Sequence, residues 1–216
     1  MLPCPAPDTC LALLIRHGAT ANNVCRPVKL QGCGSDAPLS PEGFRQAEET
    51  ARFLASACLH AIYASPLLRA QQTALAITLP HGLAVQSTPV LTEVDVGQWE
   101  GRTWSEIERG WPDDHRRYME DPGANPYLGG ESFQQVQARV GPAMQEIFRA
   151  HLGQAIAVVT HNVVNRVLLA PLLGLPLKLA RRIHLDNCGI SLVRHRDGET
   201  KLITLNSVTH LSEWSG

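Results

Sequence analysis

The chain contains two short apolar segments that each end at an ionisable side chain, and these constrain its fold more than any other feature. Residues 11–15 read LALLI and run directly into Arg16 and His17. Residues 155–159 read AIAVV and lead through Thr160 to His161. Near-continuous apolar strands are typical of a parallel sheet covered by helices on both faces, and such sheets bind ligands at the carboxyl ends of their strands. We therefore expect the two histidines to meet at one site.

The rest of the chain alternates between strand-like and helix-like patterns, which indicates an α/β fold. Further strands are expected at residues 61–64, 83–85, 190–193 and 202–205, and helices at 41–57, 67–77, 132–151 and 162–173. In the first helix, the residues expected on the buried stripe are Phe44, Ala47, Ala51 and Leu54. We expect one domain over residues 1–216, in three layers, with a mostly parallel sheet and helices on both of its faces. Residues 93–130, rich in Gly, Pro and Trp, are expected to be irregular and to form a lid-like excursion.

Composition argues against several classes of protein. The 216 residues are 44% hydrophobic and carry 19 basic and 20 acidic side chains, a net charge of −1. A nucleic-acid-binding protein usually has a basic excess, so no nucleic-acid partner is expected. No run of 18 apolar residues is present, so no membrane span is expected. The first ten residues lack the basic and apolar regions of a secretory signal, so we expect a cytoplasmic protein. Its oligomeric state stays open.

The six cysteines are scattered, with no C-x-x-C pair among them. This spacing does not fit a zinc ribbon, and a disulfide framework is unusual in a chain of this size without a secretion signal. No other cluster of side chains has metal-ligand spacing. We therefore expect neither a metal nor a cofactor.

Two further charged residues follow strand-like segments. Arg69 lies about one turn into the helix expected after residues 61–64, and Glu93 follows another strand-like stretch. Together with the strand-end histidines they predict an anion site at the carboxyl edge of the sheet. Alternatively, Arg69 is a surface residue and Glu93 is an ordinary loop carboxylate. The nearby carboxylates that compete with Glu93 for the role are Asp95, Glu100 and Glu106.

Six segments carry a resemblance to a known family. In chain order they are LIRHGATANN, LQGCGSDAPLSPEG, IYASPLLRAQQTA, LTEVDVGQWEG, GGESFQQVQARV and VVTHN, within residues 11–195. They resemble successive motifs of the histidine phosphatase superfamily, whose fold is the phosphoglycerate-mutase-like fold. The resemblance implies the same three-layer α/β architecture for this chain.

The resemblance also implies roles for the candidate residues. His17 would attack a phosphoryl group and become phosphohistidine. Glu93 would protonate the leaving oxygen and then act as the base that activates water. The phosphoryl oxygens would be held by Arg16, Arg69 and His161, with further hydrogen bonds from Asn23 and Thr20. Phosphoryl transfer depends chiefly on such positioning and on donors around the anionic oxygens. Turn formation is the alternative role for Asn23 and Thr20.

Other positions either fit the family pattern or depart from it. Gly18 is expected to let the backbone approach the phosphate. Asn162 stands where many relatives have glycine; its side chain can point away while its amide still donates to the phosphate. Ala19 replaces a common glutamate. The stretch between Glu93 and Gly130 is shorter than the insertion of cofactor-dependent mutases, which favours a phosphatase.

The lid-like segment expected at residues 93–130 contains further candidate site residues. Its tryptophans are expected to form a local aromatic core. Arg116 or Arg117, with Arg26 and Lys29 from the first loop, are candidates to meet a second negative group on the substrate. Glu131 either braces the arginines of the site or simply belongs to a helix start.

These observations predict a metal-independent phosphomonoesterase that acts through a phosphohistidine intermediate. Its expected partner is a small phosphorylated metabolite, which the sequence does not identify further. One alternative is a cofactor-dependent phosphoglycerate mutase. A second alternative is a non-catalytic phosphate-binding protein with the same fold.

Overall fold

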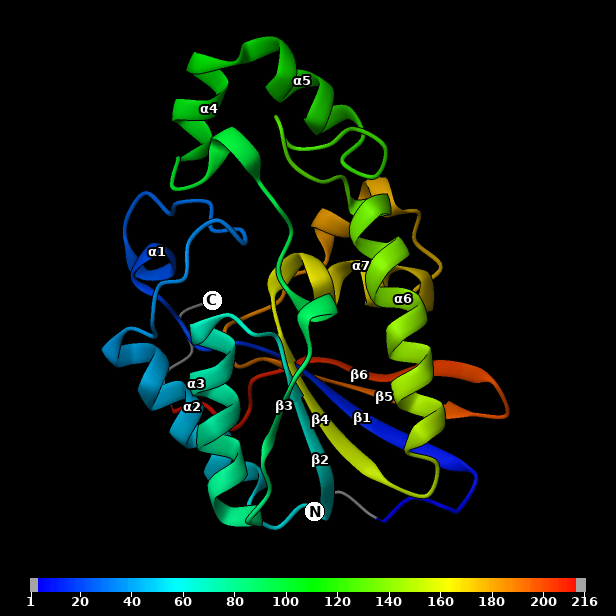
Figure 1. The fold of residues 1–216 in the computed structure, drawn as a ribbon. Coiled ribbons are helices and arrows are strands. Elements are labelled where there is room, and N and C mark those ends of the chain that lie inside the picture. The colour runs from blue at the N-terminus through cyan, green and yellow to red at the C-terminus, as the bar shows by residue number, and fades with distance from the viewer. Residues whose placement is uncertain (1–3, 213–216) are drawn as a thin grey trace.

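A computed structural model describes residues 4–212 as an α/β fold built on a six-stranded sheet (Figure 1). The strands lie in the order β3-β2-β4-β1-β5-β6. Their bounds are β1 Thr9–Arg16, β2 Leu59–Ala64, β3 Val85–Ser87, β4 Ala155–Thr160, β5 Ile190–Arg196 and β6 Glu199–Ser207. The first four strands pair in parallel, whereas β5 and β6 are antiparallel to their neighbours. The prediction of a mostly parallel sheet is confirmed.

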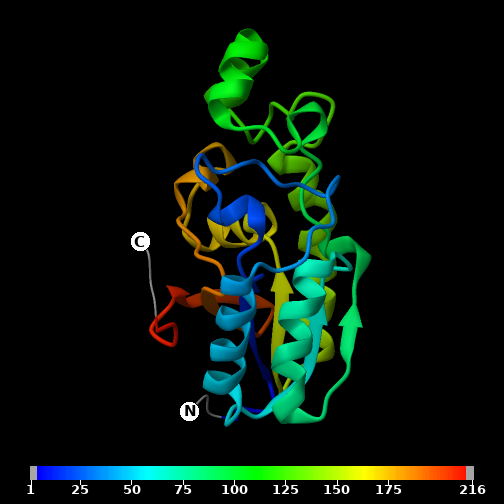
Figure 2. The ribbon, with the colours of Figure 1, turned by 90° about the vertical axis from the view of Figure 1, so that its left-hand side faces the viewer.

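Helices cover both faces of the sheet and make three layers. The α-helices are α1 Ala21–Val24, α2 Pro41–Leu54, α3 Leu68–Thr78, α4 Trp104–Gly110, α5 Pro112–Glu120, α6 Phe133–Ala150 and α7 Asn162–Leu172. In Figure 2, α2 and α3 lie in front of the sheet, with α6 behind it. Alternate residues of one strand feed the two cores: Leu13 packs with α3, and Leu14 packs with α6 and α7. This alternation follows from the two-residue period of a strand.

The register of the two central strands places the predicted site. In the parallel pair of β1 and β4, Arg16 lies opposite Thr160. The backbone N–H of His17 donates to Thr160 O at 2.9 Å, which continues the ladder by one residue. His17 and His161 therefore emerge side by side at the carboxyl edge of the sheet.

The segment 93–130 is only partly irregular, so that prediction was wrong for its middle. Helices α4 and α5 occupy much of it, above the carboxyl edge of the sheet in Figure 1. Helix α4 begins with a reciprocal capping pair between Thr103 and Glu106. Helix α5 has Pro112 in its first turn followed by acidic side chains, which suits a helix N-terminus. The Gly and Pro residues near these helices stand at the helix ends, so they do not indicate an irregular segment.

The tryptophans of this segment form the expected aromatic core. Trp99 is fully buried, and its ring meets those of Trp104, Tyr118 and Tyr127 at centroid distances of 6.3, 5.5 and 5.8 Å. Phe133 of α6 joins the same cluster. The cluster ties the 93–130 segment to α6.

Helix α2 begins as predicted but buries a different stripe. Ser40 caps it by accepting from the Gly43 backbone N–H at 3.1 Å. Ala47 and Leu54 are buried, but Phe44 is 44% exposed, so its expected burial was wrong. The buried face starts one residue earlier, at Gly43, because α2 packs on the backbone of Ala19 there.

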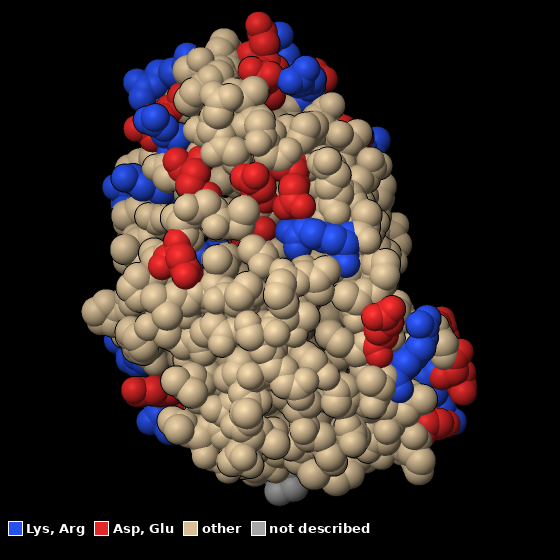
Figure 3. Space-filling view, in the orientation of Figure 1, with Lys and Arg blue, Asp and Glu red and all other residues tan. Residues whose placement is uncertain are grey.

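Charged side chains of both signs are gathered on the upper part of the molecule in Figure 3, and the surface lower on that face is largely uncharged. None of the helices in residues 4–212 is long and apolar enough to cross a bilayer.

The close approach of α2 to the loop after β1 generates a first prediction. A Cβ at Gly43 would lie 2.0 Å from Ala19 O, whereas a Cβ at Gly110 would meet nothing within 4 Å. We expect Gly43→Ala to lower the free energy of unfolding by about 1–3 kcal/mol through overpacking, measured by urea denaturation. Gly110→Ala is the matched control and should change it by less than about 1 kcal/mol. Equal stability of the two variants would show that the contact does not constrain the loop.

Candidate active site

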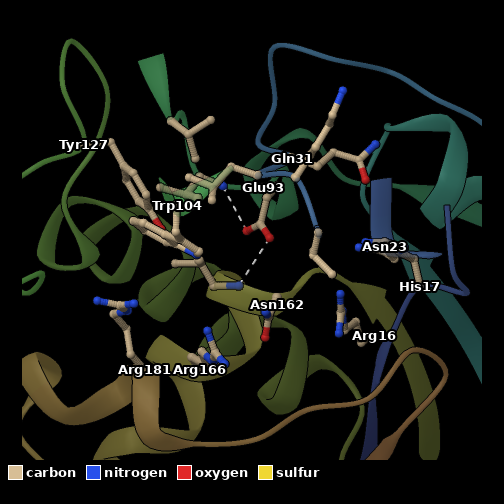
Figure 4. Close-up of a pocket in the computed structure, with 16 residues that line it drawn as sticks. Arg16, His17, Asn23, Gln31, Glu93, Trp104, Tyr127, Asn162, Arg166 and Arg181 are labelled. Atoms are coloured by element: carbon tan, nitrogen blue, oxygen red, sulfur yellow. Dashed lines mark hydrogen bonds between the residues drawn. The ribbon is translucent and has the colours of Figure 1, made fainter. Parts of the chain in front are cut away.

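A cavity of about 310 Å³ opens at the carboxyl edge of the central strands. Arg16, His17, Asn23, Glu93 and Asn162 all line it, although they are spread over most of the chain (Figure 4). The structure therefore brings together most of the residues that the sequence predicted for the site.

His17 is held as a neutral imidazole with a defined tautomer. Its Nδ1 lies 2.7 Å from Gly18 O, and because a carbonyl can only accept, Nδ1 carries the proton. Nε2 therefore has the free lone pair. Burial, followed by the positive charges of Arg16 and Arg69, lowers the pKa of His17 well below its ordinary value. The Asn187 side chain donates to His17 O at 2.8 Å and fixes the backbone at this point.

His161 stands next to His17, with 5.2 Å between the ring centroids. It is fully buried, and neither ring nitrogen has a hydrogen-bond partner among the described residues. Burial is the main cause that lowers the pKa of His161 well below its ordinary value, and the neighbouring His17, Arg69 and Arg16 lower it further. A buried polar group without a partner costs stability. His161 does not itself line the cavity, but it lies directly behind His17, which does.

Arg16 and Arg69 provide buried positive charge, and each has an unpartnered Nε. Arg16 donates to Leu185 O at 2.7 Å, and burial lowers its pKa to about 10. Arg69 donates to Gly32 O and Ser35 O, at 2.9 and 3.0 Å. It does not line the cavity itself but lies close enough to act on His17, Glu93 and His161 through its charge.

The amide side chains of Asn23 and Gln31 both present donors at the site. Asn23 Oδ1 accepts from the Thr20 backbone N–H at 3.0 Å and from Asn187 at 3.3 Å, which leaves its NH₂ group for the cavity. Gln31 Oε1 accepts from the Thr20 hydroxyl at 2.7 Å, and its buried Nε2 has no partner among the described residues. Thr20 thus orients both amides and does not itself line the cavity. Sequence reasoning missed Gln31, since nothing marked it within a polar loop.

Gly18 serves a different purpose from the one predicted. A Cβ at this position would lie 2.5 Å from Gly43 O, so glycine is required by the packing against α2. The Gly18 N–H donates to the Thr73 hydroxyl at 3.0 Å. This amide is therefore engaged within the protein, and the close approach it permits is to another backbone.

Glu93 is buried and points into the cavity (Figure 4). Its carboxylate accepts from the backbone N–H groups of Val94, Val163 and Val164, at 2.9, 3.2 and 3.4 Å. The last two amides belong to the first turn of α7. Burial raises the pKa of Glu93, and the hydrogen bonds and the charge of Arg69 oppose this shift without cancelling it.

Glu131 braces an arginine, although not one of those predicted for the site. It pairs with Arg139 at 2.9 Å and accepts from the Asp95 backbone N–H at 3.0 Å. Arg139 in turn donates to the backbone oxygens of Glu93 and Val90, at 3.2 and 2.6 Å. The pair therefore holds the backbone that carries Glu93.

Asn162, the departure from the family pattern, is the first residue of α7 and lines the cavity. Its Oδ1 is buried without a partner among the described residues. The expectation that this side chain can point away from the site is not met.

Two arginines that the sequence reading missed, Arg166 and Arg181, also line the cavity. Arg166 follows Asn162 by one helical turn, a spacing that places both on one helix face. Arg116 and Arg117, the predicted alternatives, instead pair with Asp113 and Asp114 on α5, outside the cavity.

The other two predicted cations line two different cavities. Lys29 lines the same cavity, whereas Arg26 lines a neighbouring pocket on the other side of Arg16. Within residues 4–212 no group of three or more His, Cys, Asp or Glu side chains is arranged to hold a metal ion.

Comparison with known proteins shows the family of the chain. The model of the histidine phosphatase superfamily (branch 1) matches residues 12–208. The chain belongs to the histidine phosphatase superfamily, branch 1. The predictions of this family, of its phosphoglycerate-mutase-like fold and of an enzyme of the histidine phosphatase type are confirmed.

Relatives in this superfamily include both phosphatases and mutases. The chain is 34% identical to phosphoserine phosphatase 1 of Hydrogenobacter thermophilus, over 94% of each protein. It is also 34% identical to a probable phosphoglycerate mutase GpmB of an Enterobacter species, over 85% of this chain and 84% of that protein. The crystal structure of phosphoserine phosphatase from Entamoeba histolytica in complex with 3-phosphoglyceric acid is 27% identical, with a TM-score of 0.83, and covers 94% of this chain and 99% of its own.

The lowered pKa values of the two buried histidines generate a prediction about stability. At pH values between the lowered pKa of the folded state and the ordinary value of 6.5, His17 and His161 bind protons in the unfolded chain but stay neutral in the folded protein. Their contribution to stability is therefore complete above pH 6.5 and is lost as the pH falls below it. We expect the free energy of unfolding to fall between pH 7 and pH 5, and His161→Asn to reduce that slope by up to about 1.4 kcal/mol per pH unit.

Urea denaturation at several pH values measures this slope. The matched control is His184→Asn, which removes an exposed imidazole whose Nε2 lies 3.0 Å from Asp186 and should not reduce the slope. Glu93, with its raised pKa, contributes in the opposite direction but is present in all three proteins. An unchanged slope in His161→Asn would contradict a neutral, buried His161.

Proposed function

We propose that this protein is a metal-independent phosphomonoesterase that acts on a small phosphorylated metabolite through a phosphohistidine at His17. The observation that carries the proposal is the state of His17. Its Nδ1–H donates to Gly18 O, so that a neutral ring offers the Nε2 lone pair among buried cations. A nucleophile of this kind needs a fixed tautomer and an unprotonated attacking atom.

In the first step, Nε2 of His17 attacks phosphorus and the bond from phosphorus to the ester oxygen breaks. The leaving oxygen takes the proton of Glu93. The raised pKa of Glu93 supports its arrival in the protonated form. The phosphorylated ring gains positive charge, which the Nδ1–H···O=C bond to Gly18 stabilises.

The transferring phosphoryl group needs donors around its three remaining oxygens. The side chains that support this role are Arg16 and the free amide groups of Asn23 and Gln31, which line the cavity. His161, buried beside His17, has both ring nitrogens without a partner among the described residues. Arg69 adds positive charge from behind this set. Hydrogen bonds within the protein hold Arg16, Asn23 and Gln31, so these groups require little reorganisation during the reaction.

In the second step, Glu93 acts as a carboxylate base. It takes a proton from water as the water oxygen attacks phosphorus. The bond from phosphorus to Nε2 breaks, its electron pair returns to His17, and inorganic phosphate leaves. Glu93 is protonated again and His17 is neutral, so the site is ready for another turnover.

A phosphoglycerate mutase is the alternative, because proteins named as mutases are among the relatives. The two reactions differ in the acceptor of the phosphoryl group: water in a phosphatase, a sugar acid in a mutase. Incubation with 3-phosphoglycerate and a bisphosphoglycerate primer separates them, since a phosphatase releases inorganic phosphate and a mutase forms the 2-phospho isomer.

The assignment of His17 is tested by rapid quench. Wild-type protein mixed with a ³²P-labelled phosphomonoester in EDTA should hold acid-labile, alkali-stable phosphate on His17. His17→Ala should hold none and should lose activity by about 10³-fold or more. His60→Ala, which removes an exposed histidine, is the control. A His17→Ala variant with more than about a tenth of the wild-type rate, or activity that EDTA abolishes and magnesium restores, would contradict the proposal.

The assignment of Glu93 is tested by the choice of leaving group. General acid help is worth about 10²–10⁴-fold where the leaving group is strongly basic. For Glu93→Gln we expect the first-step kcat/KM to fall steeply with glycerol phosphate and only modestly with p-nitrophenyl phosphate, measured as the pre-steady-state burst. Glu100→Gln is the matched control and should not show this dependence. Equal losses for both leaving groups would assign the acid elsewhere, with Asp95 the next candidate.

A further inference from the structure

We propose that Arg166 and Arg181 form a second anion subsite in the cavity, so that the substrates are phosphomonoesters that carry a second anionic group. In Figure 4 the two arginines lie on the opposite side of Asn162 from Arg16 and His17. The inference rests on the proposed function, because it names the class of substrate for that same site.

Arg166 is fixed in place while most of its donors stay available. It lies on α7, and its Nε donates to Ile183 O at 2.9 Å. This bond orients the guanidinium plane and leaves its two terminal NH₂ groups available to donate to an anion. Within residues 4–212 no carboxylate lies within ion-pair distance of Arg166. Burial lowers the pKa of Arg166, and the nearby Tyr127 and Glu93 oppose this shift without cancelling it.

Arg181 reaches the same cavity from the 3₁₀ segment Leu177–Arg182. Its guanidinium lies over the Trp104 ring at 4.9 Å and over the Tyr118 ring at 5.4 Å. Its NH1 also contacts the sulfur of Met119. Stacking uses the face of the guanidinium, so N–H groups at its edge remain for an anion. In the described part of the chain Arg181 has no carboxylate partner either.

The balance of charge in the cavity supports a second anion. The charged side chains that line it are Arg16, Lys29, Arg166 and Arg181 on the positive side and Glu93 on the negative side. Glu93 must be protonated when the substrate arrives. A phosphate dianion neutralises Arg16 and the nearby Arg69, which leaves Arg166, Arg181 and Lys29 uncompensated. A carboxylate or a second phosphoryl group on the substrate fits this excess, and the planar guanidinium fork suits either.

Substrate pairs that differ only in the second anion test the inference. In 3-phosphoglycerate a carboxylate stands where glycerol 3-phosphate has a CH₂OH group, and the leaving oxygen is otherwise alike. Propane-1,3-diol bisphosphate and its monophosphate form the corresponding phosphoryl pair. We expect kcat/KM to favour the member with the second anionic group in at least one pair by about tenfold or more, because charge-assisted hydrogen bonds contribute on that order. The pair that shows the preference tells which anion the subsite takes.

Arg166→Met and Arg181→Met should each remove most of this preference by raising KM for the favoured substrate. The kcat/KM of glycerol 3-phosphate should change less than about threefold. Arg182→Met is the matched control, because Arg182 is an exposed neighbour that does not line the cavity; it should keep the wild-type preference. Equal losses with both members of a pair would show that the arginines serve the fold or the phosphate, and would overturn the inference.

Binding measurements keep this test separate from that of the proposed function. Calorimetry with His17→Ala should show tighter binding of the favoured substrate than of its comparator, and Arg166→Met in that background should abolish the difference. This readout needs no turnover. Phosphatase activity without any preference in kcat/KM or binding would overturn the subsite alone. Absence of phosphohistidine, with the binding preference intact, would overturn the proposed function alone.

Discussion

The site depends on one interaction, the parallel pairing of β1 with β4 in the register that sets Arg16 opposite Thr160. The bond from the His17 backbone N–H to Thr160 O carries this register to the residue where the chemistry is proposed. Because both strands end at the same edge, two imidazoles separated by most of the chain lie 5.2 Å apart. A slip of one residue would turn His17 to the other face of the sheet, since strand side chains alternate. The buried residues on both faces of β1 prevent such a slip.

Burial of the ionisable side chains at this edge of the sheet determines which of them are charged. Imidazoles in contact with water would be partly protonated near neutrality, but here burial and the nearby arginines keep His17 and His161 neutral. Arg16 and Arg69 keep their charge because a guanidinium is a far stronger base, even with the pKa of Arg16 lowered to about 10. One buried environment therefore produces neutral rings next to permanent cations, the combination that the proposed attack of His17 on an anionic phosphoryl group requires.

The sheet and the strand-end residues could be predicted from sequence because they depend on local patterns. Apolar runs reveal buried strands, and the residues that follow them must reach the carboxyl edge. Gln31 and Arg181 could not be found in this way. Gln31 is oriented by a hydrogen bond to Thr20, and Arg181 is placed by stacking on rings from α4 and α5. Those two helices were missed because their Gly and Pro residues resemble loop signals, although the capping pair of Thr103 and Glu106 was readable.

The placement of Glu93 suits the two roles proposed for it, first as acid and then as base. The first turn of α7, where an anionic ligand would be expected to bind, instead donates two backbone N–H groups to Glu93. These amides favour the carboxylate, and burial favours the neutral acid. Because the two effects oppose one another, the pKa of Glu93 is raised only as far as the amides allow. In the proposed reaction, a phosphate dianion at the site would raise this pKa further and favour the acid. Once the leaving group has gone, the same amides would stabilise the carboxylate that takes a proton from water.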